Sequence, residues 1–119
     1  MNVFFDILDT LLNEDGDPRP HAREALISLT EMGHDVYLWS TAGEGYAVHA
    51  AWVLGVGDVV KGCCLKPYPP EDITVDYVVD DDKGMVEEYG GYVVKPYKDD
   101  SWDRELLRVV DAIEALEPS

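Results

Sequence analysis

Two apolar stretches of the chain lead directly into acidic residues. Residues 3–5 (Val-Phe-Phe) precede Asp6, and the valines at 78–79 precede Asp80, Asp81 and Asp82. A carboxylate at the end of a buried strand is held rigidly enough to bind a cation or to attack an electrophile. Adjacent carboxylates also repel one another unless a cation or a donor compensates them. The pattern predicts a cation or nucleophile site. The alternatives are a polar strand end at Asp6 and an acidic loop without a ligand at 80–82.

A third candidate group follows the strand predicted at Val36–Trp39. Ser40 and Thr41 come next, and small residues then lead into a helix expected from Glu44 to about Leu54. Backbone amides and the dipole at a helix N-terminus favour an anion, and a hydroxyl adds a donor. This stretch predicts a phosphate cradle, with simple helix capping by Ser40 or Thr41 as the alternative.

Residues 6–11 (Asp-Ile-Leu-Asp-Thr-Leu) resemble the first motif of the haloacid dehalogenase (HAD) superfamily. In the phosphatase branch that motif reads Asp-x-Asp-(Gly or Asp)-Thr-Leu after an apolar strand. The match holds at Asp6, Asp9, Thr10 and Leu11. It fails at Leu8, where those phosphatases carry a second aspartate.

Three later stretches match the remaining HAD motifs in the right order. Ser40 corresponds to the Ser/Thr of the second motif, and Lys66, followed by Pro67, to the lysine of the third. Lys61 is the alternative lysine. Asp81, with Asp80 beside it, corresponds to the principal magnesium ligand of the fourth motif. The resemblance covers about residues 2–97.

The resemblance implies phosphoryl transfer to a catalytic aspartate, Asp6, with Mg²⁺ as the cofactor. The metal would be held by the Asp6 carboxylate, the backbone carbonyl of Leu8 and Asp81. Ser40 and Lys66 would be the other catalytic residues, and Lys66 would neutralise the charge of Asp6 and of the phosphoryl oxygens. The residues implied to bind the phosphorylated substrate are Thr10, Ser40, Thr41 and Lys66.

Leu8 removes the acid that would protonate the leaving oxygen and later activate water. That contribution is typically worth roughly 10²–10⁴-fold in rate. We therefore expect a Mg²⁺-dependent phosphatase that is slow or selective for its leaving group. The alternative is a catalytically impaired HAD-like binding or regulatory protein that keeps the cation and phosphate site. Glu14, Asp17 or His21 could replace the lost acid, although ordinary solvated side chains would look the same.

The order of predicted elements favours one α/β domain over residues 1–119. Five strands alternate with helices near 22–32, 44–54, 83–89 and from Ser101 onward, the last burying Trp102 and Leu116 among others. This is a doubly wound, Rossmann-like parallel sheet with helices on both faces. The resemblance implies strand order 5-4-1-2-3 and no cap domain, since residues 13–19 and 66–74 are too short for one. Capless members act on bulky or macromolecular phosphates or use a neighbouring subunit as a lid, so a homo-oligomer is compatible.

The acidic composition argues against two classes of binding partner, nucleic acids and anionic membranes. Twenty-five acidic and nine basic residues give a formal charge of −16, which repels nucleic-acid phosphates and anionic lipid. Such acidity also suits a high-salt environment. No apolar run approaches the roughly 20 residues of a membrane helix, and no signal-peptide pattern is present, so we expect a cytoplasmic protein. Cys63 and Cys64 are expected to be reduced, small buried residues.

Overall fold

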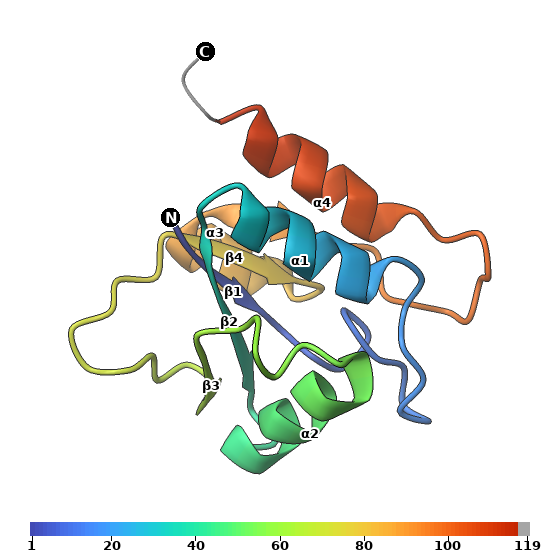
Figure 1. The fold of residues 1–119 in the computed structure, drawn as a ribbon, viewed down its shortest axis with the longest axis horizontal. Coiled ribbons are helices and arrows are strands. Elements are labelled where there is room, and N and C mark those ends of the chain that lie inside the picture. Colours follow the sequence, from blue (N-terminus) through green and yellow to red (C-terminus); the bar gives the residue numbers. More distant parts are fainter. Residues whose placement is uncertain (117–119) are drawn as a thin grey trace.

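The computed structural model describes residues 1–116, which form a five-stranded parallel sheet and four helices (Figure 1). The strands are β1 (Asn2–Phe5), β2 (Asp35–Ser40), β3 (Gly62–Leu65), β4 (Tyr77–Asp80) and β5 (Gly91–Val93). The helices are α1 (Ala22–Glu31), α2 (Glu44–Leu54), α3 (Lys83–Tyr89) and α4 (Glu105–Glu114). The sheet order is β3-β2-β1-β4-β5, which confirms the predicted α/β class and topology.

The central strand β1 is paired on both sides, and its register places the acidic residues side by side. Phe5 lies opposite Leu38 of β2 and Val79 of β4. The amide of Asp6 then donates to the Val79 carbonyl at 3.0 Å, so Asp6 emerges next to the end of β4. In this topology β1 and β4 flank the point where the strand order reverses, which is where open α/β sheets bind ligands.

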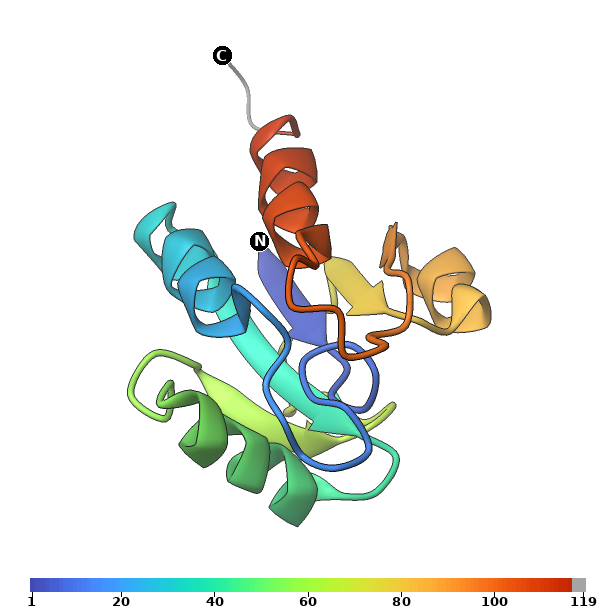
Figure 2. The same cartoon turned by 90° about the vertical axis from the view of Figure 1, so that its right-hand side faces the viewer.

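Alternating side chains of β1 anchor the strand in both layers of the core. Val3 and Phe5 pack with residues of α1, α2 and α4, whereas Phe4 faces the side covered by α3 (Figure 2). Phe4 stacks on Tyr37 with ring centroids 4.6 Å apart. Full burial of one such side chain contributes about 1.5–3 kcal/mol. The base beneath Asp6 is therefore rigid.

The adjacent cysteines of β3 follow the same alternation. Cys63 is half-buried and packs with the first cluster, and Cys64 is buried in the second. Both are free thiols. Burial raises the pKa of Cys64 to about 11, so it behaves as a small apolar residue. The expectation of a buried thiol is met at Cys64 and only in part at Cys63.

The last helix begins later than the sequence predicted. The prediction started it at Ser101 with Trp102 and Leu116 on the buried face, but Trp102 is 78% exposed and Leu116 59% exposed. The Asp103 carboxylate accepts a hydrogen bond from the Glu105 amide at 2.9 Å, which starts α4 at Glu105. The apolar periodicity holds from Leu106 onward.

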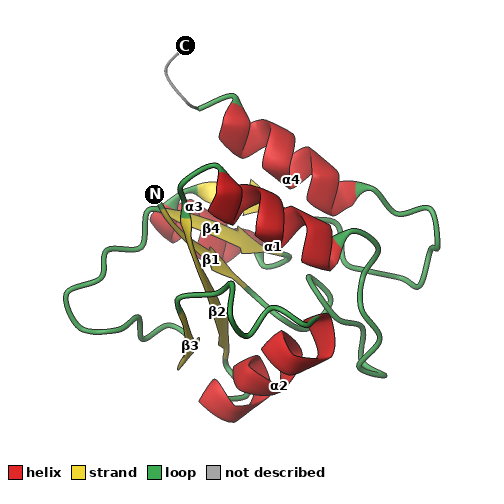
Figure 3. Ribbon diagram, in the orientation of Figure 1, coloured by secondary structure: helices red, strands yellow, loops and turns green. Residues whose placement is uncertain are grey.

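Two long connections leave the carboxyl edge of the sheet open. Within the described chain, residues 13–19 and 66–74 contain no helix and no strand beyond one isolated bridge (Figure 3). Neither connection forms a cap over the strand ends. None of the helices in residues 1–116 has both the length and the apolar character needed to cross a bilayer.

Candidate active site

Three carboxylates meet where β1 and β4 end. Asp6, Asp80 and Asp81 each offer an oxygen, and these three oxygens lie within 4.8 Å of one another. Asp6 is 7% exposed and Asp80 is fully buried. The acidic stretches that are 74 residues apart in sequence are therefore brought together as the strand pattern predicted. Asp80 belongs to the cluster as closely as Asp81, which had been predicted as the principal metal ligand.

Lys66 lies inside this cluster and bonds two of its members. Its Nζ donates to Asp6 Oδ1 at 3.0 Å and to Asp80 Oδ2 at 2.9 Å. Lys66 directly follows β3. Its backbone amide donates to the Ser40 carbonyl at 2.9 Å, which fixes the backbone of Lys66 beside the end of β2. The alternative lysine, Lys61, lies at the other end of β3 and is exposed.

The pKa values in the cluster indicate that the positive charge of Lys66 does not fully compensate the buried carboxylates. Burial, the charge of Asp80 and a hydrogen bond with Asp81 raise the pKa of Asp6 to about 7, against the opposing effect of Lys66. Burial and the neighbouring Asp80 also raise the pKa of Asp81. Burial alone would lower the pKa of Lys66, but the two carboxylates outweigh it and raise that pKa. A proton or a further cation is therefore favoured here.

Thr10 holds the second oxygen of Asp6. Its side chain is fully buried, and its hydroxyl donates to Asp6 Oδ2 at 3.2 Å. With Oδ1 taken by Lys66, both carboxylate oxygens have fixed partners. This enclosed hydroxyl orients the Asp6 carboxylate, and substrate binding by Thr10 stays a prediction.

An open cleft with a cavity volume of about 310 Å³ covers the cluster. Its floor is polar, while Leu8, Pro67 and Met85 give it an apolar rim. Leu8 is 45% exposed at this rim. Thr41 lines the cleft, as the predicted phosphate cradle requires. The complete lining of the cleft is Asp6, Leu8, Asp9, Thr41, Lys66, Pro67, Asp80, Asp81, Asp82 and Met85.

Ser40 is the last residue of β2, at the strand end where the sequence placed it, and its catalytic and substrate-binding roles stay predictions. It is buried, its hydroxyl accepts the Ala42 amide at 3.0 Å, and it is not among the cleft-lining residues of the described chain. Its backbone carbonyl instead holds the Lys66 amide. Ser40 does not cap α2 either, because the N-cap of that helix is Gly43. Its observed role is to shape the turn between β2 and α2.

Tyr46 is a neighbour of the site that the sequence analysis did not identify. Burial raises its pKa, and the negative charges of Asp6 and Asp9 raise it further. Tyr46 is therefore near enough for the charges of both aspartates to act on its hydroxyl. The one sequence signal was its place in the first turn of the helix expected to face the anion.

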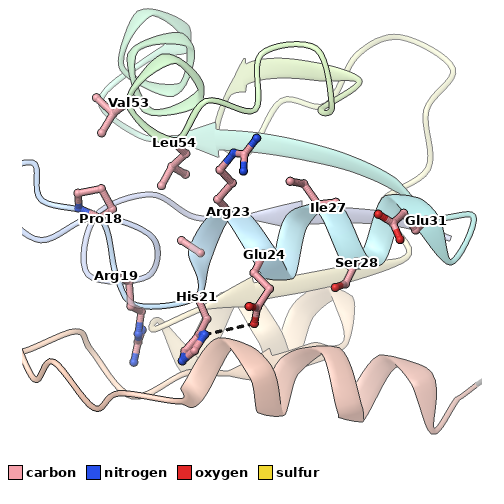
Figure 4. A pocket seen from close by; sticks show the side chains of 11 residues that line it. Pro18, Arg19, His21, Arg23, Glu24, Ile27, Ser28, Glu31, Val53 and Leu54 are labelled. Carbon is pink, nitrogen blue, oxygen red and sulfur yellow. Dashed lines mark hydrogen bonds and ion pairs between the residues drawn. The ribbon is translucent and has the colours of Figure 1, made fainter.

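The residues considered as replacements for the missing acid lie outside this cleft. His21 pairs with Glu24 at 3.2 Å in a separate hollow of about 760 Å³ between the start of α1 and the end of α2 (Figure 4). Glu14 lines a small neighbouring hollow with Asp9. Asp17 accepts a hydrogen bond from Asn13. None of the three is placed to protonate a group bound at Asp6.

The fold and the cleft together define a doubly wound α/β protein with an acidic site at its topological switch point. No protein-family model matches the chain, and no curated protein matches it at a significant level. The chemistry of the site therefore has to be inferred from its own residues.

We predict a pH dependence of stability in protein stripped of divalent cations with EDTA. The folded pKa of Asp6, about 7, lies above the ordinary value of 3.8, so between these values the folded state holds the extra proton. The free energy of unfolding should therefore fall as pH rises from about 4 to 7 and level off above. One proton gives a slope of at most about 1.4 kcal/mol per pH unit.

Urea unfolding at pH 5 and pH 8 measures this difference. Asp6→Asn removes the titrating group and should reduce the loss of stability between the two pH values. Asp58→Asn, at an exposed position outside the cleft, is the matched control and should leave the loss as it is in the parent. An unchanged slope in Asp6→Asn would contradict the assignment.

Proposed function

We propose that this protein is a Mg²⁺-dependent phosphoryl hydrolase of the HAD type with Asp6 as its nucleophile. The observation that carries the proposal is the set of contacts on Asp6, which lies buried between Lys66 and Thr10 and beside two further carboxylates. Such fixed partners orient a carboxylate for attack. The open cleft above it suits a bulky or macromolecular phosphorylated substrate.

The residues present fit a magnesium ion. Three carboxylate oxygens within 4.8 Å form the hard-oxygen set that Mg²⁺ prefers, and burial together with neighbouring negative charge raises the pKa values of Asp6 and Asp81. Asp6, Asp81 and the backbone carbonyl of Leu8 would hold it. When bound, Mg²⁺ neutralises phosphoryl charge and orients the substrate.

The chain's own residues then account for the transfer. An Asp6 oxygen forms a bond to phosphorus as the bond to the leaving oxygen breaks. Lys66 balances charge on Asp6 and on the phosphoryl oxygens, and Asp80 holds Lys66 in place. Water then attacks phosphorus as the bond between phosphorus and the Asp6 oxygen breaks, the proton lost by water passes to solvent, and inorganic phosphate leaves with the Asp6 carboxylate restored.

Leu8 cannot supply a proton to the leaving oxygen. With Pro67 and Met85 it gives the cleft rim an apolar surface, which suits a leaving group that is apolar and departs as a stabilised anion. We propose that the enzyme is selective for such leaving groups.

The absence of a proton donor at Leu8 also favours the second candidate function, a binding or regulatory protein that retains the cation and phosphate site. The cytoplasmic location remains a prediction.

Hydrolysis of p-nitrophenyl phosphate with Mg²⁺ or with EDTA tests the proposed function. We expect release of nitrophenolate that EDTA abolishes and that added Mg²⁺ restores. Asp6→Asn should lose this activity because the amide is a poor nucleophile, whereas Asp58→Asn should retain it. A folded parent without Mg²⁺-dependent turnover would reject the phosphatase and favour the binding protein.

Leu8→Asp tests the role of the missing acid. We expect turnover of an alkyl phosphate to rise at least about tenfold, with a smaller gain on p-nitrophenyl phosphate, because alkoxides need a proton most. The measurement is kcat on both substrates, with Leu8→Asn as the control that cannot donate a carboxylic proton. Equal gains on both substrates would point to a general electrostatic effect and would count against the missing-acid account.

A further inference from the structure

Arg19 is a buried cation outside the cleft, and all five of its N–H groups have partners. Its Nε and Nη2 donate to the two carboxylate oxygens of Asp103 at 3.1 and 2.9 Å. Its Nη1 donates to the carbonyls of Asp9 and Thr10, each at 3.3 Å, and its Nη2 also donates to the Lys95 carbonyl at 2.6 Å. The guanidinium is 0% exposed. A guanidinium whose N–H groups are all bonded fixes the positions of its partners and also balances the charge of the carboxylate.

These bonds join two segments from opposite ends of the chain. One is the turn after β1, and the other is the loop between β5 and α4. Tyr97 strengthens the junction, because its amide donates to the Asp9 carbonyl at 2.8 Å and its ring lies 5.7 Å from the guanidinium carbon of Arg19. Burial raises the pKa of Asp103, but hydrogen bonds from Arg19 and the Glu105 amide outweigh burial and lower this pKa. Asp103 is therefore favoured in its ionised form, paired with Arg19.

The clamped turn is the one that carries the groups of the site. Asp9 has a φ of 62°, a left-handed conformation that is uncommon outside glycine, although aspartate adopts it more readily than most residues. Leu8, whose carbonyl would bind the metal, precedes it. Thr10, whose hydroxyl orients Asp6, follows it. The carbonyls that Arg19 holds are those of Asp9 and Thr10.

We propose that Arg19, fixed by Asp103, is a positioning residue that sets the turn at residues 8–10. The turn in this conformation directs the Thr10 hydroxyl at Asp6 and presents the Leu8 carbonyl to the cation. This inference rests on the proposed function, since it concerns the same metal and nucleophile. Lysine cannot replace Arg19, because an ammonium has three donors and no planar fork.

The experiment compares Arg19→Lys and Asp103→Asn with the parent at a temperature where circular dichroism shows each to be folded. Its readouts are the Mg²⁺ concentration that half-saturates the site in an isothermal calorimetric titration of the folded protein, and kcat and KM for p-nitrophenyl phosphate. We expect half-saturating Mg²⁺ to rise and kcat to fall by about 10–100-fold, the usual effect of losing a residue that orients metal ligands. KM should change little. Arg108→Gln, which removes the ion pair between the exposed Arg108 and the buried Glu105 of α4, should match the parent.

A merely structural clamp would lower the melting temperature and leave half-saturating Mg²⁺ unchanged, because unfolding alters the amount of site and not its affinity. That result overturns the inference while the parent's activity keeps the proposed function intact. A parent without a Mg²⁺ response or turnover overturns both. If Arg19→Lys does not fold, Asp103→Asn decides alone, since it keeps the side-chain volume and removes the charge of the pair and one of the two oxygens that accept from Arg19.

Discussion

The site depends on one buried ammonium placed between two buried carboxylates. Lys66 contacts Asp6 and Asp80 at about hydrogen-bond distance, and the third carboxylate, Asp81, lies close by. Burying charge is costly unless it is paired, and removing one partner leaves the others uncompensated. In this cluster burial and the charge of Asp80 outweigh the pairing with Lys66, which is why the pKa of Asp6 reaches about 7. The molecule retains an electrostatic cost that a bound cation would relieve.

The rest of the fold can be understood as the means of holding that cluster. The β1 register sets Asp6 beside the end of β4, and burial of Phe4 and Phe5 fixes the strand. Lys66 reaches the same point because its amide is held by the last residue of β2. Four strands therefore contribute to the position of the site, directly or through a neighbouring strand. This is the usual way in which a parallel sheet brings distant sequence segments together.

Much of this arrangement could be predicted from the sequence because its signals are local. Apolar runs ending in Asp6 and in Asp80–Asp82 indicated which residues lie at strand ends, and Lys66 before Pro67 indicated the cation. The enclosed orientation of Thr10 and the buried hydroxyl of Ser40 could not be predicted, since they depend on how the turns close. Arg19 carried no local signal at all. Its partner Asp103 lies 84 residues away in sequence, and the same carboxylate accepts the Glu105 amide at the start of α4.

The most direct test of the central claim is the change in melting temperature on adding Mg²⁺ at pH 8, measured for the parent, Asp6→Asn and Asp81→Asn. A ligand at about 100 times its Kd adds about 2.7 kcal/mol to the free energy of unfolding. The parent should therefore melt at a higher temperature with Mg²⁺, and each variant should lose most of that shift. Asp6→Asn should also melt above the parent in EDTA, because it removes a poorly compensated charge. If both variants respond to Mg²⁺ as the parent does, the ion binds elsewhere and the account of this site is contradicted.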